Sequence, residues 1–386
     1  MSIYVNIFRD FKEYKRFSMD VYSDYLEFYL KQKYKSEIKV SSFIPRMLLS
    51  KIMPIMLKMR FARYIEYPFQ IRKIRNAYDL NHIIEDGYAH LMNYPLDPKK
   101  TIVTVHDIIP LLSWKKLIPQ LTYPHDPRLA KYSYKYLKKA AHIIAVSENT
   151  KKNLIKFCAC KEENISVIYN GCGKSFTMLS EKKRNTLRYN KFKFPRNSFL
   201  ILITGHQEYK NHFSALKIFE QIKKYKKNVF LVRLGRQSQM WKETKSKFAI
   251  KDNLIEINSM NHEDIVELYN SVDCLLFPSW YEGFGFPPLE AMACGIPVIS
   301  SNAASLPEIV GDAGLMYKPN DLNGMIKGLI SIIDNESIRK HMIANGLKQA
   351  SKFTWEDNLK KTVNVYQSIL TEKKVRRNWE MHDVAN

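Results

Sequence analysis

The chain has 386 residues and a formal net charge of +23, and its composition is 45% hydrophobic and 26% charged. This length allows two domains with separate cores, and the composition is that of a soluble globular protein. No stretch reaches the roughly 18 to 20 uncharged apolar residues of a transmembrane helix. The positive charge favours an anionic partner: nucleic acid, an anionic membrane surface or a phosphorylated substrate.

The five cysteines are odd in number, form no C-x-x-C pair and have no pair of histidines at metal-ligand spacing near them. We therefore expect reduced, mostly buried thiols, as in a cytosolic protein. The first residues, MSIYVNIFRDFKEYKR, lack the basic-then-apolar layout of a signal peptide. The sequence thus predicts a protein that is made and kept in the cytoplasm.

Short apolar runs alternate with amphipathic segments, which is the pattern of buried parallel strands joined by helices. A first series of strands is predicted over residues 3–8, 101–107, 142–147 and 165–170. A second series is predicted over residues 199–205, 229–235, 254–257, 274–279 and 296–301.

Two such arrays indicate an α/β protein with two Rossmann-like domains facing a cleft. The polar and basic stretch 171–197 separates the two series and is interpreted as a linker. The predicted parts are a first domain over 1–178, a linker over 179–196, a second domain over 197–355, and a C-terminal helix and tail over 356–386. An apolar stripe marks the helix: Leu359, Val363, Val365, Tyr366, Ile369 and Leu370.

Residues 43–75 concentrate positive charge, with Glu66 as the single acid. The basic residues are Arg46, Lys51, Lys58, Arg60, Arg63, Arg72, Lys73 and Arg75. Apolar residues recur at helical spacing, and Pro54 is expected to break the segment into two short helices. Such a segment fits docking on an anionic membrane, or an ordinary helix pair that faces the core and has a basic outer side.

Polar residues follow several predicted strands, where ligands gather in open α/β sheets. His106 and Asp107 end one strand, as a hydroxyl-binding or acid–base pair, or as a structural histidine. A structural role is favoured for His82, and Ser147 is a plausible helix N-cap. Gly205 ends a second-domain strand, and Lys210 and Asn211 follow about one turn later. Lys210 either neutralises a phosphate or is a solvated lysine.

The stretch PSWYEGFGFPPLEAMACGIPVIS, residues 278–300, joins a strand to a helix expected to begin near Pro287 or Pro288. Gly283 and Gly285 let the backbone approach a ligand, and the helix N-terminus suits a diphosphate. Glu290, expected in the first turn, is placed to accept hydrogen bonds from a ribose diol, and Glu282 is placed to reach a second ring. Alternatively, the glycines permit a tight turn and the glutamates are solvated.

Residues 278–321 closely resemble the signature of glycosyltransferase family 4, including its E-x7-E motif. VTVHDIIPL, AHIIAVSENTKKNL, ISVIYNG and GHQEYKNH match the family in the expected order, so the likeness covers most of residues 78–370. The family implies a GT-B fold whose C-terminal helix returns to the first domain. It also implies retaining transfer of a sugar from a nucleoside diphosphate, with no obligatory metal or other cofactor.

By motif position, the resemblance implies that Lys210 binds the diphosphate, that Glu290 holds the ribose, and that Glu282 and His106 meet the donor sugar. The donor-binding set also includes Gly283, Phe284, Gly285, Gly205, His206 and Asn211. Membrane docking of Arg46, Lys51, Lys58, Arg60 and Arg63 becomes the favoured interpretation of the basic segment, on the acceptor side, because the family often extends lipid-linked glycans.

Two departures stand out. The segment after the first strand, FRDFKEYKRFSMDVYSDYL, lacks the glycine-rich loop that is common in the family. The run GHQEYK also lacks the arginine that commonly assists the phosphate lysine, so Lys210 acts with the helix dipole alone or with Arg236.

The motifs look most like those of bacterial mannosyltransferases of polysaccharide assembly, which makes GDP-mannose the first choice of donor and UDP- or dTDP-sugars the alternatives. The acceptor is expected to be a glycan or lipid-linked glycan at the inner face of the cytoplasmic membrane. The rival class is a basic nucleic-acid-binding protein, for which KYSYKYLKK (131–139) has the interleaved composition but no known module appears. An inactive relative is disfavoured because Glu282, Glu290, Lys210 and His106 are all present.

Overall fold

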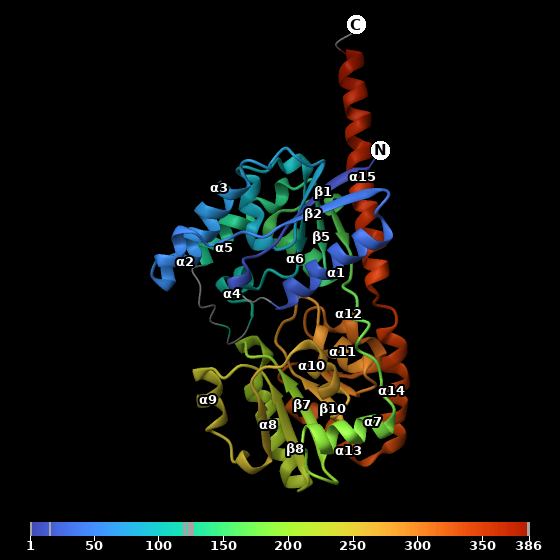
Figure 1. Ribbon diagram of the computed structural model, residues 1–386. Coiled ribbons are helices and arrows are strands. Elements are labelled where there is room, and N and C mark those ends of the chain that lie inside the picture. The colour runs from blue at the N-terminus through green and yellow to red at the C-terminus, as the bar shows by residue number, and fades with distance from the viewer. Residues whose placement is uncertain (1, 15–16, 119–120, 122–126, 384–386) are drawn as a thin grey trace. The chain divides into compact units, whose positions relative to one another are not determined.

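The computed structural model describes residues 2–14, 17–118, 121 and 127–383. The chain forms two compact units. Unit 1 comprises Met1–Trp114, Tyr123–Gly171 and Trp355–Asn386, and unit 2 comprises Lys115–Thr122 and Cys172–Thr354. Each unit is built on one six-stranded parallel sheet with helices packed against it (Figure 1), which confirms the predicted α/β class with two Rossmann-like domains.

The sheet of unit 1 has the strand order β2-β1-β3-β4-β5-β6. Its strands are β1 (Ile3–Phe8), β2 (Ile38–Phe43), β3 (Leu80–Ile83), β4 (Thr101–Val105), β5 (His142–Ala145) and β6 (Ile165–Val167). Its helices are α1 (Phe17–Lys33), α2 (Ile55–Phe61), α3 (Tyr67–Ile71), α4 (Ile109–Trp114), α5 (Pro127–Tyr134), α6 (Glu148–Cys158) and α15 (Trp355–Asp383).

The sheet of unit 2 has the order β12-β11-β10-β7-β8-β9. Its strands are β7 (Phe199–Thr204), β8 (Val229–Leu234), β9 (Leu254–Ile257), β10 (Cys274–Phe277), β11 (Val298–Ser301) and β12 (Leu315–Tyr317). Its helices are α7 (Glu181–Thr186), α8 (His212–Tyr225), α9 (Gln239–Lys245), α10 (His262–Tyr269), α11 (Phe286–Ala293), α12 (Leu306–Val310), α13 (Leu322–Asp334) and α14 (Glu336–Ala350).

The buried apolar strands predicted from the sequence are all present. Three strands are absent from the two predicted series: the buried strand β3, which the sequence indicated only as a strand end at His82, and β2 and β12, which both lie at an edge of their sheet and are only partly buried. An edge strand does not require a continuous apolar run, so neither IKVSSF nor LMY stands out in the sequence.

Residues 179–196, predicted as a linker, are instead folded into unit 2, as part of its segment Cys172–Thr354. It contains α7, continued by a π-helical turn over Leu187–Lys191. The Arg188 guanidinium donates to the Asp273 carboxylate at 2.8 Å, and Lys191 pairs with Asp264 at 2.5 Å. The basic composition that suggested a free linker is therefore matched by acids of unit 2.

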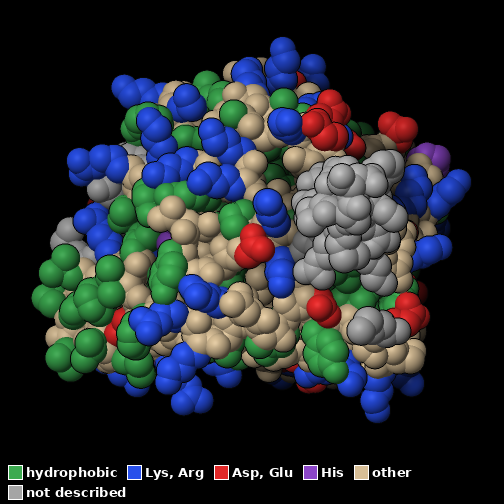
Figure 2. Space-filling view, turned by 90° about the horizontal axis from the view of Figure 1, so that it is seen from above, with side chains coloured by type: hydrophobic (Ala, Val, Ile, Leu, Met, Phe, Trp, Pro, Cys, Tyr) green, Lys and Arg blue, Asp and Glu red, His purple; other side chains and the backbone are tan. Residues whose placement is uncertain are grey.

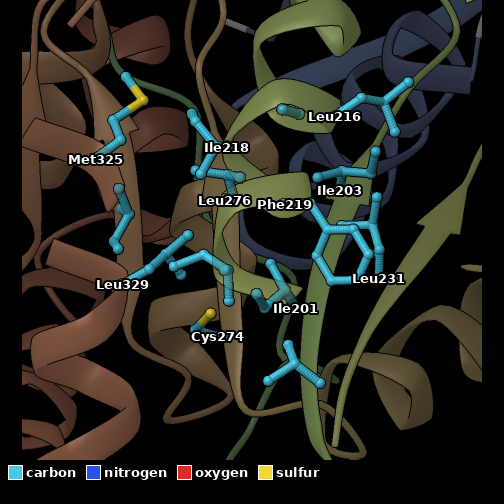
Figure 3. Close-up of a cluster of buried hydrophobic side chains, with 14 of the residues drawn as sticks. Ile201, Ile203, Leu216, Ile218, Phe219, Leu231, Cys274, Leu276, Met325 and Leu329 are labelled. Carbon is cyan, nitrogen blue, oxygen red and sulfur yellow. The ribbon is translucent and has the colours of Figure 1, made fainter. Parts of the chain in front are cut away.

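The core of unit 2 lies between its sheet and α8 and α13 (Figure 3). Ile201, Leu231 and Leu276 from three strands meet Phe219 of α8 and Leu329 of α13 there, all fully buried. This packing fixes the positions at which β7, β8 and β10 end, and the candidate site is built on those ends.

In unit 1 the C-terminal helix α15 packs on the first domain, as the family resemblance implied. Buried His82 of β3 joins sheet and helix, because its Nε2 lies 2.8 Å from Thr104 Oγ1 and its Nδ1 lies 2.7 Å from the Tyr366 hydroxyl. The structural role favoured for His82 is confirmed. The Ser147 side chain accepts from the Thr150 N–H, which confirms it as the N-cap of α6.

The basic segment is divided at Pro54, as predicted, into a short 3-10 turn over Leu49–Ile52 and helix α2. A π-helical turn over Ala62–Glu66 joins α2 to α3. Arg63 is a correction to the predicted membrane-facing set. Its side chain is 20% exposed and donates to the Glu85 carboxylate at 2.7 Å, so its charge is paired inside unit 1.

Candidate active site

The site in unit 2 lies where the strand order of the sheet reverses. Strands β7 and β10 are neighbours there, although β8 and β9 intervene in the chain. Ligands of open α/β sheets bind beyond the carboxyl ends of strands at such a switch point. The loops after β7 and β10 are joined directly, because the Trp280 N–H donates to the Tyr209 carbonyl oxygen at 2.8 Å.

Lys210 and Glu282 form an ion pair across these two loops. Lys210 Nζ lies 2.9 Å from Glu282 Oε1 and 3.1 Å from Oε2, and the two side chains are only 10% and 9% exposed. The ammonium group also lies 4.8 Å from the centroid of the Phe277 ring at the end of β10. Two residues predicted separately from the sequence are thus brought together in a water-poor setting, where charges interact strongly.

The loop that carries Glu282 is held by hydrogen bonds to its backbone. The fully buried Ser305 hydroxyl lies 3.0 Å from the Glu282 carbonyl oxygen and 2.7 Å from that of Phe284. Gly285, the N-cap of α11, has a φ of 116°, and a Cβ atom there would lie 3.1 Å from Leu306 Cδ2. The turn therefore favours glycine at this position, because other residues rarely adopt this backbone conformation.

Glu290 lies in the second turn of α11, which begins at Phe286, and this corrects the predicted first-turn position. Its side chain is half-buried and receives a hydrogen bond from the Tyr269 hydroxyl of α10. Burial raises the pKa of Glu290 to about 7, although the hydrogen bond from Tyr269 and the charge of Lys210 oppose the shift. A carboxyl group with this pKa is charged in about half of the molecules at neutral pH.

The loop after β7 is shaped by two left-handed residues. Gly205 has a φ of 95°, and a Cβ there would meet Lys210 Cγ at 2.9 Å, so the lysine chain packs directly on the glycine. Asn211 has a φ of 57° and caps α8 by accepting from the Ser214 N–H. Its Nδ2 donates to the carbonyl oxygens of Pro278 and Pro319. The buried Asn211 amide is thus engaged in positioning α8 beside the loop after β10.

Positive charge gathers at this loop. Burial first, and then the charges of Arg236, Lys210 and Arg233, lower the pKa of His206. Arg236 is exposed just beyond β8. Arg233, inside β8 and fully buried, was not singled out from the sequence. The available signal was a charged residue within FLVRLG, because a central strand of a parallel sheet is normally apolar throughout.

In unit 1, His106 follows β4 and is buried. Its Nε2 lies 3.0 Å from the Ile84 carbonyl oxygen, and since a carbonyl only accepts, Nε2 carries the proton and Nδ1 is the acceptor. Burial lowers the pKa of His106 to about 4, so the ring is neutral. The structure thus shows the backbone hydrogen bond expected of a structural histidine, and a contact of His106 with a donor sugar stays a prediction.

Carboxylates accompany His106 at the ends of the neighbouring strands. Asp107 follows it directly, and Glu85 and Asp86 follow β3. Burial, and then the charges of Asp107 and Glu85, raise the pKa of Asp86. No sequence pattern singled out Asp86, because its environment is made by strands distant in the chain. Among residues 2–14, 17–118, 121 and 127–383, no three His, Cys, Asp or Glu side chains are grouped so as to hold a metal ion.

Two family models match the chain, one for each unit. The model described as Glycosyltransferase Family 4 matches residues 33–173, and that of Glycosyl transferases group 1 matches residues 184–349. The two six-stranded parallel sheets have the GT-B fold of solved glycosyltransferases. Unit 1 thus carries a Glycosyltransferase Family 4 domain, and unit 2 carries a Glycosyl transferases group 1 domain.

Two curated relatives come from Escherichia coli. The chain is 46% identical over 107 residues to O-antigen chain mannosyltransferase B, a match that covers 28% of each protein. It is 24% identical over 301 residues to the serotype-specific mannosyltransferase WbdA, which covers 75% of this chain and 36% of WbdA. The chain thus spans about a third of the length of these relatives.

Solved structures share the fold. WaaG, a glycosyltransferase involved in lipopolysaccharide biosynthesis, superposes with a TM-score of 0.72 at 12% identity over 94% of this chain and 99% of that chain. Anabaena HepE in complex with UDP and glucose gives 0.71 at 16% identity over 95% and 100%. In the part of the chain that the structure describes, no helix has the length and apolar character needed to cross a membrane.

Proposed function

We propose that the protein is a retaining glycosyltransferase that moves a hexose from a nucleoside diphosphate to a glycan or lipid-linked glycan acceptor in cell-surface polysaccharide synthesis. The observation that carries this proposal is the buried Lys210–Glu282 pair beside Glu290, at the switch point of a dinucleotide-type sheet. Mannosyltransferases of O-antigen synthesis among the relatives, and UDP with glucose in HepE, support it.

The proposed chemistry follows from where charge develops. As the bond between the anomeric carbon and the phosphate oxygen breaks, the electron pair passes to the diphosphate and the sugar becomes oxocarbenium-like. The acceptor hydroxyl oxygen then bonds to the anomeric carbon, and its proton passes to the departing diphosphate. A fixed cation beside the leaving group then lowers the barrier, because it needs no reorganisation during the reaction. Lys210 takes this role, held in place by Gly205 and Glu282. Glu282 accepts hydrogen bonds from the donor sugar, and Glu290, oriented by Tyr269, accepts them from the ribose.

GDP-mannose is the first choice of donor, with UDP- and dTDP-sugars as alternatives. A thermal-shift panel of GDP-, UDP- and dTDP-sugars tests this choice, followed by a turnover assay with the donor that stabilises the protein. We expect Lys210→Met to lower turnover more than donor affinity, because the charge it stabilises builds up in the transition state. The control is Lys217→Met, which removes an exposed lysine from the same helix region. The proposal fails if no nucleotide sugar shifts the melting temperature.

We also propose that unit 1 docks on an anionic membrane through the surface of residues 46–69. Large apolar side chains are exposed there, among them Ile52 at 88%, Phe69 at 69% and Leu49 at 64%. Figure 2 shows hydrophobic side chains gathered on the side of unit 1 that carries α2 in Figure 1, with Lys and Arg side chains abundant on this face. This exposure favours the membrane interpretation over a helix pair that faces the core, since membrane-surface segments combine apolar and basic side chains.

Hydrogen bonds to the buried Glu66 hold the exposed apolar turn in place. Glu66 is 5% exposed, and its carboxylate accepts from the Ser50 N–H at 2.9 Å, the Ser50 hydroxyl at 2.7 Å and the Leu48 N–H at 3.2 Å. Burial opposes ionisation, but these hydrogen bonds outweigh it and lower the pKa of Glu66. Glu66, the only acid of the basic segment, is thus buried. From this position it fixes the turn on which Leu49 and Ile52 are exposed.

Co-sedimentation with vesicles tests this docking. We expect binding to vesicles that contain anionic lipid at low salt, and weaker binding to neutral vesicles. Ile52→Ser and Lys51→Glu should each reduce binding several-fold, whereas Ile155→Ser, an exposed isoleucine on α6, should not. Equal binding of all variants, or no binding of the unaltered protein, contradicts membrane docking without touching the proposed transfer reaction.

A further inference from the structure

Arg233 is a fully buried guanidinium in the interior of unit 2. Its Nη1 donates to the Gly235 carbonyl oxygen at 2.7 Å, and its Nη2 donates to those of Arg236 at 3.0 Å and Gly205 at 3.4 Å. These acceptors belong to two different loops, one after β7 and one after β8. A single side chain therefore fastens together the backbones that leave two neighbouring strands.

The charge of Arg233 is not neutralised by a direct ion pair. Within the described residues, no carboxylate lies at ion-pair distance from it, and its Nε is buried without a hydrogen-bond partner. Burial lowers the pKa of Arg233 to about 10, with the charge of Glu256 opposing the shift, so the group is still charged at neutral pH. An unpaired buried charge is destabilising, and stability alone does not explain its presence.

Aromatic and acidic neighbours hold the guanidinium in one place. Its Cζ lies 4.1 Å from the centroid of the Trp241 ring, a cation–π contact. Trp241 is itself fixed, because its Nε1 donates to Glu256 at 2.5 Å, and Lys245 pairs with the same carboxylate at 2.6 Å. The Glu256 carboxylate thus bonds other donors, and its charge acts on Arg233 only from a distance.

The backbone that Arg233 holds is the backbone on which Lys210 rests. A Cβ atom on Gly235 would lie 2.1 Å from the Gly205 carbonyl oxygen, so the two loops are in direct contact. On its other side Gly205 supports Lys210, whose Cγ and Cε would lie 2.9 and 3.0 Å from a Cβ there. Arg233, Gly205 and Lys210 therefore form one packed column that ends at Glu282.

We propose that Arg233 is a positioning residue for the donor diphosphate: it fixes the loop that carries Lys210 and supplies, from beneath the loop, the second positive charge that GHQEYK lacks. This inference rests on the proposed function. It assigns to Arg233 the role of the arginine that the loop of this chain lacks. Arg236, the replacement expected from the sequence, is exposed and takes part through its carbonyl oxygen.

The test measures binding of GDP and UDP, and of guanosine and uridine, by calorimetry. For Arg233→Gln we expect diphosphate affinity to fall by about tenfold, or ~1.4 kcal/mol, with nucleoside affinity unchanged. Loss of a merely structural contact would instead weaken the binding of both kinds of ligand. Arg233→Lys should keep most of the diphosphate affinity but lower turnover, because one ammonium group cannot hold three carbonyl oxygens.

Arg188→Gln is the matched control. It removes another largely buried arginine of unit 2, one that is paired with Asp273, and should lower stability without changing diphosphate affinity. If Arg233→Gln does not fold, Arg233→Lys decides, and unchanged turnover in that variant overturns the proposal. Unchanged diphosphate affinity in Arg233→Gln also overturns it while leaving the proposed function intact. If the unaltered protein binds neither GDP nor UDP, both fall together.

Discussion

Removing either member of the Lys210–Glu282 pair should destabilise unit 2, and removing both should be less harmful than the sum. The ammonium group lies 2.9 and 3.1 Å from the two carboxylate oxygens, and both side chains are about nine-tenths buried. Lys210→Met leaves the Glu282 charge in a poorly solvated place, as Glu282→Gln leaves that of Lys210. Breaking a buried pair in this way costs about 3 kcal/mol, so each single variant should lose roughly that much.

The double variant, Lys210→Met with Glu282→Gln, has no buried charge left to desolvate. We expect it to lose about 2 kcal/mol relative to the unaltered protein, which corresponds to a coupling of about 4 kcal/mol in the double-mutant cycle. Urea unfolding of the four proteins at pH 7 measures it. The control is Lys340 with Glu336, an exposed pair on α14 at 2.7 Å, for which we expect a coupling of about 0.3 to 0.5 kcal/mol.

Activity should not follow stability in this series. The double variant should recover stability while its turnover remains as low as that of Lys210→Met, since the charge that stabilises the departing diphosphate is absent from both. Stability losses that simply add would show that the two groups do not interact in solution. A double variant that regains turnover would refute the role assigned to Lys210.

Three further outcomes follow from the structure. Burial raises the folded-state pKa of Glu290 from 4.5 to about 7, so the folded protein binds the Glu290 proton more tightly than the unfolded chain does. The unfolding free energy of the unaltered protein should therefore fall between pH 4.5 and 7 by up to about 3 kcal/mol more than that of Glu290→Gln. Urea unfolding across this pH range measures the difference. Gly205→Ala places a Cβ against Lys210 at a φ of 95° and should lower the unfolding free energy by about 1 to 3 kcal/mol and turnover with it; unchanged kinetics would contradict the packing argument. Glu66→Gln replaces an acceptor of three donors by an amide that also donates, and should lower the unfolding free energy by about 2 kcal/mol and weaken vesicle binding, measured by thermal unfolding and co-sedimentation.

The sequence predicted most of the fold because buried strands of parallel sheets are continuous apolar runs. Glu282, Glu290 and Lys210 were found as residues that follow such strands. What the sequence did not reveal depends on contacts between distant segments. The pairing of Lys210 with Glu282 joins residues 72 positions apart, and the hydrogen bond from Tyr269 to Glu290 comes from a separate helix.

Net charge was the least specific of the sequence signals, for a physical reason. A sum counts Arg63, Arg188 and Arg233 equally with Lys51 and Arg46, although the first three lie inside the units. Their charges are directed to Glu85, to Asp273 and to backbone carbonyl oxygens, so they contribute little to attraction at the surface.

The two proposed anionic partners, a membrane and a diphosphate, would therefore interact with different basic residues of the chain. Lys51 and Arg46 are exposed to solvent, where salt at 0.1 M ionic strength limits the range of their attraction to a membrane to about 10 Å. Lys210 and Arg233 lie in a water-poor interior, where screening is weak and a short-range interaction with a diphosphate is strong. Under the two proposals, the same residue type serves surface attraction in unit 1 and preorganised charge in unit 2, and burial, which the sequence does not display, decides between the two.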